Sequence, residues 1–577
     1  MKHLIVGLAA AAAACAQTPI ETLADTGADV TIYPGNIITS EANAPRAEAV
    51  AVRDGYIVGV GETEALSATW PAATTDETFA GKTIAPGFID PHIHMALSSI
   101  QYAIPLTPPW PMATPDGMVR GLPDRDAFFT RLRELEAATP EGEPVIAYGF
   151  HDLVHGALDR HDLDAVTTTR PLVVWHYSSH DFYLNTPALE WTNTDSALHE
   201  KFEGVPLGED GEPTGRVFED AVGHLLETLG PYLLGPDKLE TGLEGFSGLL
   251  RAGGVTTVAD LGYGLFGFPL EDANIAGNWV SPETSGYRLY LVPEHRAFNA
   301  AFGETRVQAV LDMVSGAKET PAPMLPQVKF FADAAFYSQT MRVSDPGYLE
   351  GQSEGSPGLW VIQPDDMVPT ITPYWEAGLN VRIHSNGDAA QTATLNALET
   401  LRDTRPDARF VFEHAGLFSP EQVARAADLG AAISAASHYV FYLGEAYQAP
   451  LGDPRGAWIL PLASLSEAGV PVTLHSDAPL APPLPLRAAS VHMTRATREG
   501  GELTVTEKLS ATEALESITI DAAYALGLEE EIGSIRVGKR ADFTILDADP
   551  LDTAGEDWPE IGVWGVVLGG DKRPLDN

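Results

Sequence analysis

The chain has 577 residues, of which 80 are acidic and 35 are Lys or Arg, so its formal net charge is −45. Such an excess of negative charge repels phosphate backbones and anionic membranes, which argues against nucleic-acid binding. It is consistent with a solvated acidic surface or with steering of cationic substrates. Hydrophobic residues make up 44% and charged residues 20%, which predicts a folded chain long enough for a large barrel and a smaller companion domain.

Residues 1–16 have the layout of an export signal, with a basic start, an apolar stretch and then small residues. Small residues around Cys15 permit cleavage before Gln17, whereas Cys15 itself occupies the position at which a bacterial lipoprotein is cut and lipidated. We therefore expect an exported protein, either soluble in the periplasm or held at the bacterial envelope by a lipid anchor at Cys15. Because Cys15 is the only cysteine, an internal disulfide is excluded.

Short alternating strands occur near both ends of the chain. ADVTIYPGNIIT and AEAVAVRDGYIVGVG follow the signal, and IGSIRVGKRADFTILDAD and GVWGVVLGGD lie at the far end. The breaks between them fall at Pro-Gly and Asp-Gly pairs, which are typical of turns. We predict one small β-sandwich domain built from residues 17–84 and 533–577.

The middle of the chain alternates strand-like apolar runs with helical stretches, which is the pattern of parallel βα units. Eight such units that close on themselves predict an α/β protein with a (β/α)8 TIM-like barrel over residues 85–532. The candidate strands are TIAPGFIDPHIHM, GVTTVADLG, YRLYLVP, QVKFFAD, LNVRIHSNGD, RFVFEHAG, AAISAASH and GVPVTLHSDAP.

One part of the middle does not fit eight regular units. Extra strand-like runs, VIAYGFHD and PLVVWHYSSHDFYLN, occur among loops rich in Pro, Gly and Asp. We interpret residues 100–250, approximately, as an insertion after the first barrel strand that folds over the barrel mouth. The alternative is that one of these runs is itself a barrel strand.

Histidines and a carboxylate recur at the ends of the predicted strands. His92 and His94 are two residues apart, so on a strand both imidazoles face the same side. Three later strands close with His384, His414 and Asp477. Each residue alone would more often be a structural polar group. Because the catalytic groups of a barrel gather where its strands end, four such strand ends together predict a metal site.

Lys329 lies in the middle of the strand QVKFF, where an unpaired ammonium group facing the interior would be unfavourable. One alternative is that Lys329 faces solvent or pairs with Asp333, which shares its face of the strand. The other is a carboxylated lysine, whose carbamate would bridge two cations. The sequence leaves both alternatives open.

The motifs APGFIDPHIHM, VKFFAD, RIHSNGD, FEHAG and TLHSDAP resemble the amidohydrolase superfamily. The likeness is to its type 3 branch, which is similar to N-substituted formamide deformylases, and it covers nearly everything after the signal. The run Asp333-Ala334-Ala335 and the histidine-rich insertion depart from the family pattern, which leaves the substrate open. By this resemblance the metal ligands are His92, His94, Lys329, His384, His414 and Asp477.

The resemblance implies a metal-dependent hydrolase that cleaves the C–N bond of a small amide, formamide or cyclic amide. One or two ions of Zn²⁺ or another divalent metal would lower the pKa of bound water to roughly 7. The resulting metal-bound hydroxide would attack the carbonyl carbon. Asp477 would take up the proton and return it to the leaving amine as a general acid.

Other functions remain open. The same hydroxide also cleaves esters, lactones and carbamates, and the fold is also compatible with a non-catalytic, metal-binding surface lipoprotein. Asp477 favours catalysis, because a structural site needs no acid–base group. His180 and His438 are weaker candidates for binding the small-molecule substrate, and each can equally be a hydrogen-bonded loop histidine. The remaining histidines of the insertion are interpreted as structural or surface residues: His151, His155, His161 and His176.

Overall fold

The computed structural model describes residues 27–575, apart from residues 116 and 280. Its middle contains eight parallel strands, and each overlaps one of the strands predicted from the sequence. In chain order they are β6 (Phe88–Ile93), β13 (Val255–Tyr263), β14 (Arg288–Pro293), β15 (Gln327–Phe331), β16 (Asn380–Ser385), β17 (Phe410–His414), β18 (Ala432–Ala436) and β19 (Val472–His475).

These eight strands are hydrogen-bonded as two sheets, in the orders β14-β13-β6 and β15-β16-β17-β18-β19. At one seam the N–H of His94 donates to the carbonyl of Ala478 (3.0 Å), and the N–H of Asp477 donates to the carbonyl of His92 (3.1 Å). At the other seam an isolated parallel bridge joins the residue after β14 to β15. The eight strands therefore follow one another in the order of a barrel. The continuous hydrogen-bond ladder of the predicted closed barrel is interrupted at both junctions between the two sheets.

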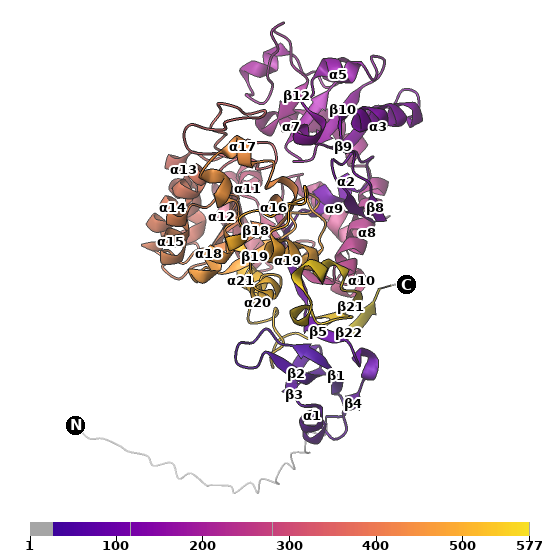
Figure 1. The fold of residues 1–577 in the computed structure, drawn as a ribbon, viewed down its shortest axis with the longest axis vertical. Helices are drawn as coiled ribbons and strands as arrows, with labels where there is room; N and C mark the ends of the chain where they lie inside the picture. Colours follow the sequence, from indigo (N-terminus) through magenta and orange to yellow (C-terminus); the bar gives the residue numbers. More distant parts are fainter. Residues whose placement is uncertain (1–26, 116, 280, 576–577) are drawn as a thin grey trace, which may run out of the picture.

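Helices follow the barrel strands and surround them (Figure 1). Local sequence sets where they begin: the side chain of Ser419 caps α15 and accepts from the N–H of Gln422, whose own side chain caps in return. The helices around the barrel are α2 (Met95–Gln101), α8 (Pro236–Ala252), α9 (Phe268–Asn278), α11 (His295–Phe302), α12 (Arg306–Val314), α13 (Pro364–Glu376), α14 (Asp388–Arg402), α15 (Pro420–Asp428), α16 (His438–Leu443), α18 (Leu462–Glu467), α19 (Pro485–Thr494), α20 (Ala511–Glu516) and α21 (Ile520–Leu526).

Both ends of the described chain contribute to one further sheet, at the bottom of Figure 1. Its order is β22-β21-β20-β5-β1-β2-β3, with β4 beside β1. The sheet curls, since Ile57 donates its N–H to the carbonyl of Lys539 just before β20 (2.8 Å). Its strands are β1 (Thr31–Ile38), β2 (Arg46–Arg53), β3 (Tyr56–Gly61), β4 (Thr74–Thr75), β5 (Thr83–Pro86), β20 (Phe543–Leu546), β21 (Val563–Leu568) and β22 (Asp571–Pro574).

The small β domain predicted from the two termini is therefore present, and its strands form one curled sheet. The two terminal segments continue one ladder, because β20 pairs antiparallel with β5. Apolar side chains from both ends of the sheet, such as Val52, Phe543 and Val567, then meet in one cluster. The second face has its own smaller cluster around Ile32 and Leu66.

Between β6 and β13 the chain forms a separate lobe at the opposite end of the barrel from the terminal sheet (Figure 1). Its sheet has the order β12-β11-β10-β9, and this sheet lies in the range predicted for the insertion. Helix α3 packs on it through a cluster that includes Phe128 and Val174. The elements of this lobe are α3 (Arg125–Ala138), β9 (Val145–Phe150), α4 (Asp152–His155), α5 (Arg160–Asp164), β10 (Leu172–His176), β11 (Asp181–Leu184), α6 (Thr186–Trp191), β12 (Arg216–Phe218) and α7 (Val222–Leu233).

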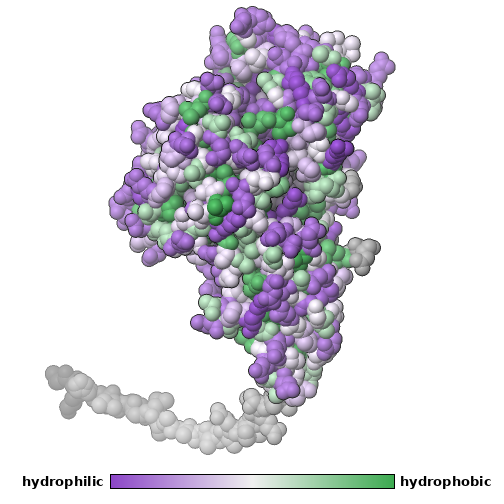
Figure 2. Space-filling model, viewed as in Figure 1, coloured by the Kyte–Doolittle hydropathy of each residue, from purple (hydrophilic) through white to green (hydrophobic). Residues whose placement is uncertain are grey.

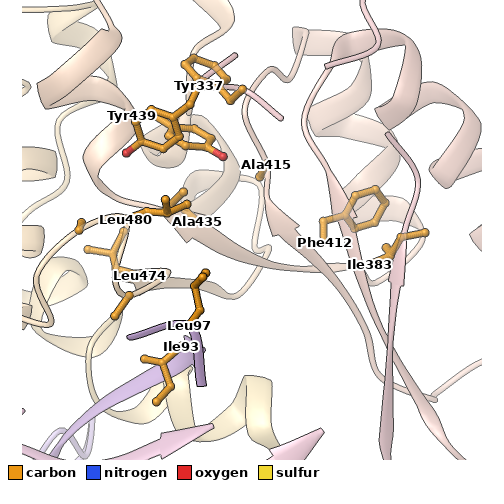
Figure 3. Close-up of a cluster of buried hydrophobic side chains, with 14 of the residues drawn as sticks. Ile93, Leu97, Tyr337, Ile383, Phe412, Ala415, Ala435, Tyr439, Leu474 and Leu480 are labelled. Carbon is orange, nitrogen blue, oxygen red and sulfur yellow. The ribbon is translucent and has the colours of Figure 1, made fainter. Parts of the chain in front are cut away.

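Strand alternation decides which side chains enter the barrel. On β17, Glu413 reaches inward to His92, so its neighbour Phe412 faces the surrounding helices. Ile383 on β16 is the register partner of Phe412, and the two side chains lie side by side in Figure 3. The barrel strands thus present an apolar layer to the helices and polar groups to the interior.

The face of the molecule in Figure 2 is mostly polar, with apolar residues in small patches among the charged ones. None of the described helices is both long enough and apolar enough to cross a bilayer. The export signal predicted over residues 1–16, including Cys15, lies outside the described residues.

Candidate metal centre

Four barrel strands bring imidazole, amine and carboxylate groups together. His92 lies on β6, and His94 follows it at the N-cap position of α2. His414 ends β17, Asp477 follows β19 by two residues, and Lys329 lies on β15. Five of the six residues predicted as ligands therefore converge inside the barrel, towards the carboxyl ends of its strands.

Asp477 lies at the centre of this group. Its Oδ1 is 3.2 Å from Nε2 of His94 and 3.5 Å from Nε2 of His92, and its Oδ2 is 3.5 Å from Nδ1 of His414. Nζ of Lys329 is 3.3 Å from Nε2 of His92. Two ligand atoms on one tetrahedral zinc ion, each about 2.0–2.1 Å from the metal, are about 3.4 Å apart. The observed spacings match those of ligands around a shared cation.

The protonation states also suit a cation. Burial lowers the pKa of His92 and of His414 well below the ordinary value, so both rings are neutral and present a lone pair. Burial alone would raise the pKa of Asp477, but the hydrogen bond from His94 and the nearby positive charge outweigh it, and the pKa lies below its usual range. Neutral imidazoles with an ionised carboxylate form a donor set that fits Zn²⁺.

Glu413 orients His92 from behind. Its Oε2 accepts from Nδ1 of His92 at 2.7 Å, and its Oε1 accepts from Nε of Arg382. Because a carboxylate can only accept, the His92 proton lies on Nδ1 and the lone pair lies on Nε2, towards Asp477. The sequence analysis missed Glu413 and Arg382. Their signal was a pair of opposite charges on neighbouring strands predicted to be buried, where charges persist only when paired.

His475, the last residue of β19, is a further imidazole in the group that the sequence analysis did not single out. Its Nε2 is 3.2 Å from Nδ1 of His414, and its Nδ1 is 2.8 Å from Oγ of Ser434. His92, His414 and His475 offer nitrogens that lie within 4.8 Å of one another. The available signal was its position two residues before Asp477, since side chains two apart on a strand share a face.

His384 lies beside the centre. Its ring centroid on β16 is 4.5 Å from that of His414. Its Nε2 lies 3.0 Å from the carbonyl oxygen of Ala334 and 3.0 Å from Nδ2 of Asn386. This nitrogen is engaged by neighbours outside the group around Asp477, so the role of His384 as a ligand stays a prediction.

Lys329 is fully buried, which excludes a solvent-facing side chain. Lys329 does not form an ion pair with Asp333 either. The Asp333 carboxylate accepts hydrogen bonds from the backbone N–H groups of Arg342 (2.8 Å), Asn386 (2.9 Å) and Gly387 (2.9 Å). Burial lowers the pKa of Lys329 to about 8, so part of the amine is neutral near that pH. The neutral amine is the form that combines with carbon dioxide; carboxylation itself stays a prediction.

The negative charge of Asp477 contributes to the pKa of both histidines that were predicted to contact substrate, His180 and His438. His180, from the loop between β10 and β11, places Nδ1 3.1 Å from Oε2 of Glu219. His438 begins α16, and its ring stacks on Tyr337 with centroids 5.4 Å apart. Burial lowers the pKa of His438 to about 4, and within the described part of the chain neither of its ring nitrogens has a hydrogen-bond partner.

The mouth above the centre is crowded with rings. Tyr337 and Tyr439 lie together in Figure 3, with centroids 5.4 Å apart. Tyr177 of the insertion lies 5.5 Å from Tyr337 and donates its hydroxyl to the carbonyl of Leu480, after β19 (2.5 Å). The insertion therefore packs directly on the loops that carry the candidate centre.

A buried group of imidazoles and a carboxylate at the carboxyl ends of barrel strands fits the class of metal-dependent hydrolases, because these groups are ligands of catalytic zinc. The chain belongs to one family of this class, the amidohydrolase family, which matches residues 80–572. It is 27% identical over 558 residues to an N-substituted formamide deformylase of Arthrobacter pascens, covering 94% of this chain and 98% of that protein. It is 26% identical over 538 residues to the putative amidohydrolase YtcJ of Bacillus subtilis, covering 90% and 94%.

Among solved structures, a metal-dependent hydrolase of Pyrococcus horikoshii superposes with a TM-score of 0.67. The match covers 91% of this chain and 99% of that one at 19% identity, so it shows the fold alone. The family assignment made from the motifs is confirmed. The comparisons leave the individual site residues and the substrate as predictions.

Proposed function

We propose that this amidohydrolase cleaves the C–N bond of a small amide, formamide or cyclic amide. The observation that carries the proposal is the place of Asp477, an ionised carboxylate within 3.5 Å of three imidazoles at the carboxyl ends of barrel strands. The N-substituted formamide deformylase to which the chain is similar supports the choice of bond.

His92, His94, His414 and Asp477 would hold the cation, with His475 and Lys329 beside them. A divalent cation such as Zn²⁺ supplies, when bound, a polarised substrate carbonyl and a water molecule acidic enough to react near pH 7. Glu413 keeps Nε2 of His92 free of a proton, and Asp477 accepts the proton of the attacking water at a carboxylate oxygen. Asp477 then hands this proton to the leaving nitrogen, which departs as an amine.

Lys329 decides how many cations the site holds. If its amine were carboxylated, the carbamate would add negatively charged oxygen donors to the site, which would favour a second cation. Its lowered pKa of about 8 and its position 3.3 Å from His92 support this form. If the amine remains free, its positive charge disfavours a second cation, and a single ion is expected.

The test is the substitution Asp477→Asn, which keeps the shape of the side chain and removes the proton acceptor. We expect kcat for a panel of formamides and amides to fall by at least about 100-fold. Zinc content, measured by elemental analysis, should change little, because the histidines remain. Asp407→Asn, at an exposed position, is the matched control. Wild-type turnover by the Asp477 variant would refute the acid–base role, and a wild-type protein that turns over esters alone would refute the C–N bond.

A further inference from the structure

The backbone of Asp477 depends on its surroundings for its conformation. Its φ of 54° lies in the left-handed region, which is unfavourable for a residue with a Cβ and persists where neighbouring groups enforce it. The N–H of Asp477 donates to the carbonyl of His92 (3.1 Å), and the carbonyl of Asp477 accepts from the N–H of Leu480 (3.0 Å). The second bond closes a tight turn over residues 477–480. The place of the Asp477 carboxylate therefore depends on how this turn is held.

Tyr177 of the insertion holds the far end of the turn. It directly follows β10, and its hydroxyl donates to the carbonyl of Leu480 (2.5 Å). Tyr177 and Leu480 are both buried, so solvent competes little for this carbonyl. Leu480 thus donates its N–H to Asp477 and accepts the hydroxyl of Tyr177. This one residue connects the insertion with the proposed proton acceptor.

Tyr177 is itself held firmly in the insertion. Its N–H donates to the carbonyl of Phe150 (2.8 Å), and its carbonyl accepts from the hydroxyl of Tyr148 on β9 (2.9 Å). Its ring meets the ring of Trp110 edge-on, with centroids 4.7 Å apart, and lies 5.5 Å from that of Tyr337. The insertion sheet therefore presents the hydroxyl to the turn in a fixed direction.

The other side of the turn is held by the barrel. The N–H of His94 donates to the carbonyl of Ala478 (3.0 Å), and the N–H of Ala478 donates to Oγ of Ser476 (3.0 Å). These contacts lie at the ends of β6 and β19, which also carry the candidate centre. The hydroxyl of Tyr177 comes from a separate sheet, so a change in the insertion can reach Asp477 through it.

We propose that Tyr177 is a positioning residue for Asp477, through which the insertion contributes to proton transfer. This role rests on the proposed function, in which Asp477 accepts and returns the proton. Without the hydroxyl, the carbonyl of Leu480 loses its partner and the turn relaxes towards less strained backbone angles. The Asp477 carboxylate then leaves the geometry that proton transfer needs, while the rings around the mouth stay in place.

The test is Tyr177→Phe, which removes the hydroxyl and keeps the ring. We expect kcat per bound zinc ion to fall about 10–100-fold, because a small misplacement of a reacting group is enough for such a loss. KM and zinc content should stay unchanged. Tyr102→Phe is the matched control and should keep the wild-type kcat, since within the described part of the chain the buried hydroxyl of Tyr102 has no hydrogen-bond partner. A hydroxyl that served stability alone would lower Tm and leave kcat per bound zinc ion unchanged.

Hydrogen exchange followed by mass spectrometry probes the same contact without turnover. Peptides that span residues 476–482 should exchange faster in Tyr177→Phe than in the wild type, and the control should leave them unchanged. Faster exchange supports the hold on the turn even if the wild type cleaves no amide, so the two proposals fail separately. Tyr148→Phe, which loosens Tyr177, should shift both readouts in the same direction by a smaller factor, and it serves if Tyr177→Phe does not fold. Wild-type kcat per bound zinc ion, or wild-type exchange of these peptides, in the folded variants would overturn the proposal.

Discussion

His414 and Asp477 have left-handed backbone conformations, with φ of 68° and 54°. By strand alternation His414 would share the outward face of Phe412, two residues earlier. The positive φ turns its imidazole towards the interior, where it meets Asp477. Such a conformation is unfavourable for a residue with a Cβ, by about 1–2 kcal/mol, and it persists where the surrounding structure enforces it. The ends of β17 and β19 are therefore strained at the two residues that the proposed chemistry uses.

Glu413→Gln tests how far metal binding by the candidate centre depends on the carboxylate that accepts the hydrogen bond of His92. The substitution weakens the acceptor that fixes the His92 proton on Nδ1, and it leaves the buried Arg382 without a counter-charge. We expect zinc affinity to fall about 10–100-fold and stability to fall by about 3–5 kcal/mol. Glu421→Gln, at an exposed position at the start of α15, is the matched control.

Metal competition with a chromogenic chelator measures the affinity, and thermal unfolding of the metal-free protein measures the stability. If Glu413→Gln holds zinc as tightly as the Glu421→Gln control does, Glu413 does not orient a ligand. If only the stability changes, its role is confined to neutralising Arg382.

The sequence predicted part of this residue-scale arrangement. Histidines at strand ends and the pair His92 and His94 could be recognised, because strand periodicity and barrel geometry are general. For His475 and Glu413 the sequence contains only a signal of inward-facing, paired groups, because their closeness to His92 depends on which strands lie opposite each other in the barrel. The engagement of His384 by Ala334 depends on a loop conformation that no periodicity encodes.

At the scale of elements, the eight barrel strands were predictable because each is a buried apolar run flanked by turn residues. The interrupted ladder and the curled terminal sheet were not. Hydrogen bonds between β20 and β5 join residues more than 450 positions apart, and hydrophobic patterning marks which residues are buried without naming their partners. Strands with one apolar and one polar face have the same alternating sequence pattern in a sandwich of two sheets and in one curled sheet.

The contact between α2 and α8 links the barrel helix before β13 to the candidate centre, because α2 begins directly after His94. A Cβ on Gly242 of α8 would lie 1.8 Å from the carbonyl oxygen of Ser99 on α2. Gly242→Ala therefore forces the two helices apart. We expect a loss of about 1–3 kcal/mol in stability and weaker zinc binding, because the start of α2 shifts with His94.

Gly248→Ala in the same helix is the matched control. The nearest atom to its added Cβ, at 4.0 Å, belongs to the flexible Arg251 side chain. Since alanine is favoured over glycine in helices by up to about 1 kcal/mol, this variant should keep or raise Tm. Equal Tm values for the two variants would show that α2 and α8 can separate freely, and that their contact does not position His94.

At the scale of the whole molecule, the excess of acidic residues is the dominant property. Eighty acidic and 35 basic side chains leave far more carboxylates than ion pairs can neutralise. Among the described residues, ionic contacts between solvent-exposed groups, such as Arg131 with Glu134, contribute little each. The net repulsion therefore opposes the compact fold, and it is largest where screening is weakest.

Added salt should consequently stabilise this protein. Raising the concentration of sodium chloride from about 0.01 M to about 0.1 M shortens the screening length from about 30 Å to about 10 Å. This change removes most of the repulsion between distant carboxylates. It weakens the exposed ion pairs less. We expect Tm, followed by calorimetry with the metal content held fixed, to rise steeply over this range and then to level off. Chloride is preferred to sulfate, because sulfate stabilises proteins by exclusion from their surface whatever their charge. A Tm that stays constant or falls would mean that the acidic side chains are already balanced locally, for instance by bound cations, and that the surface charge is not a source of instability.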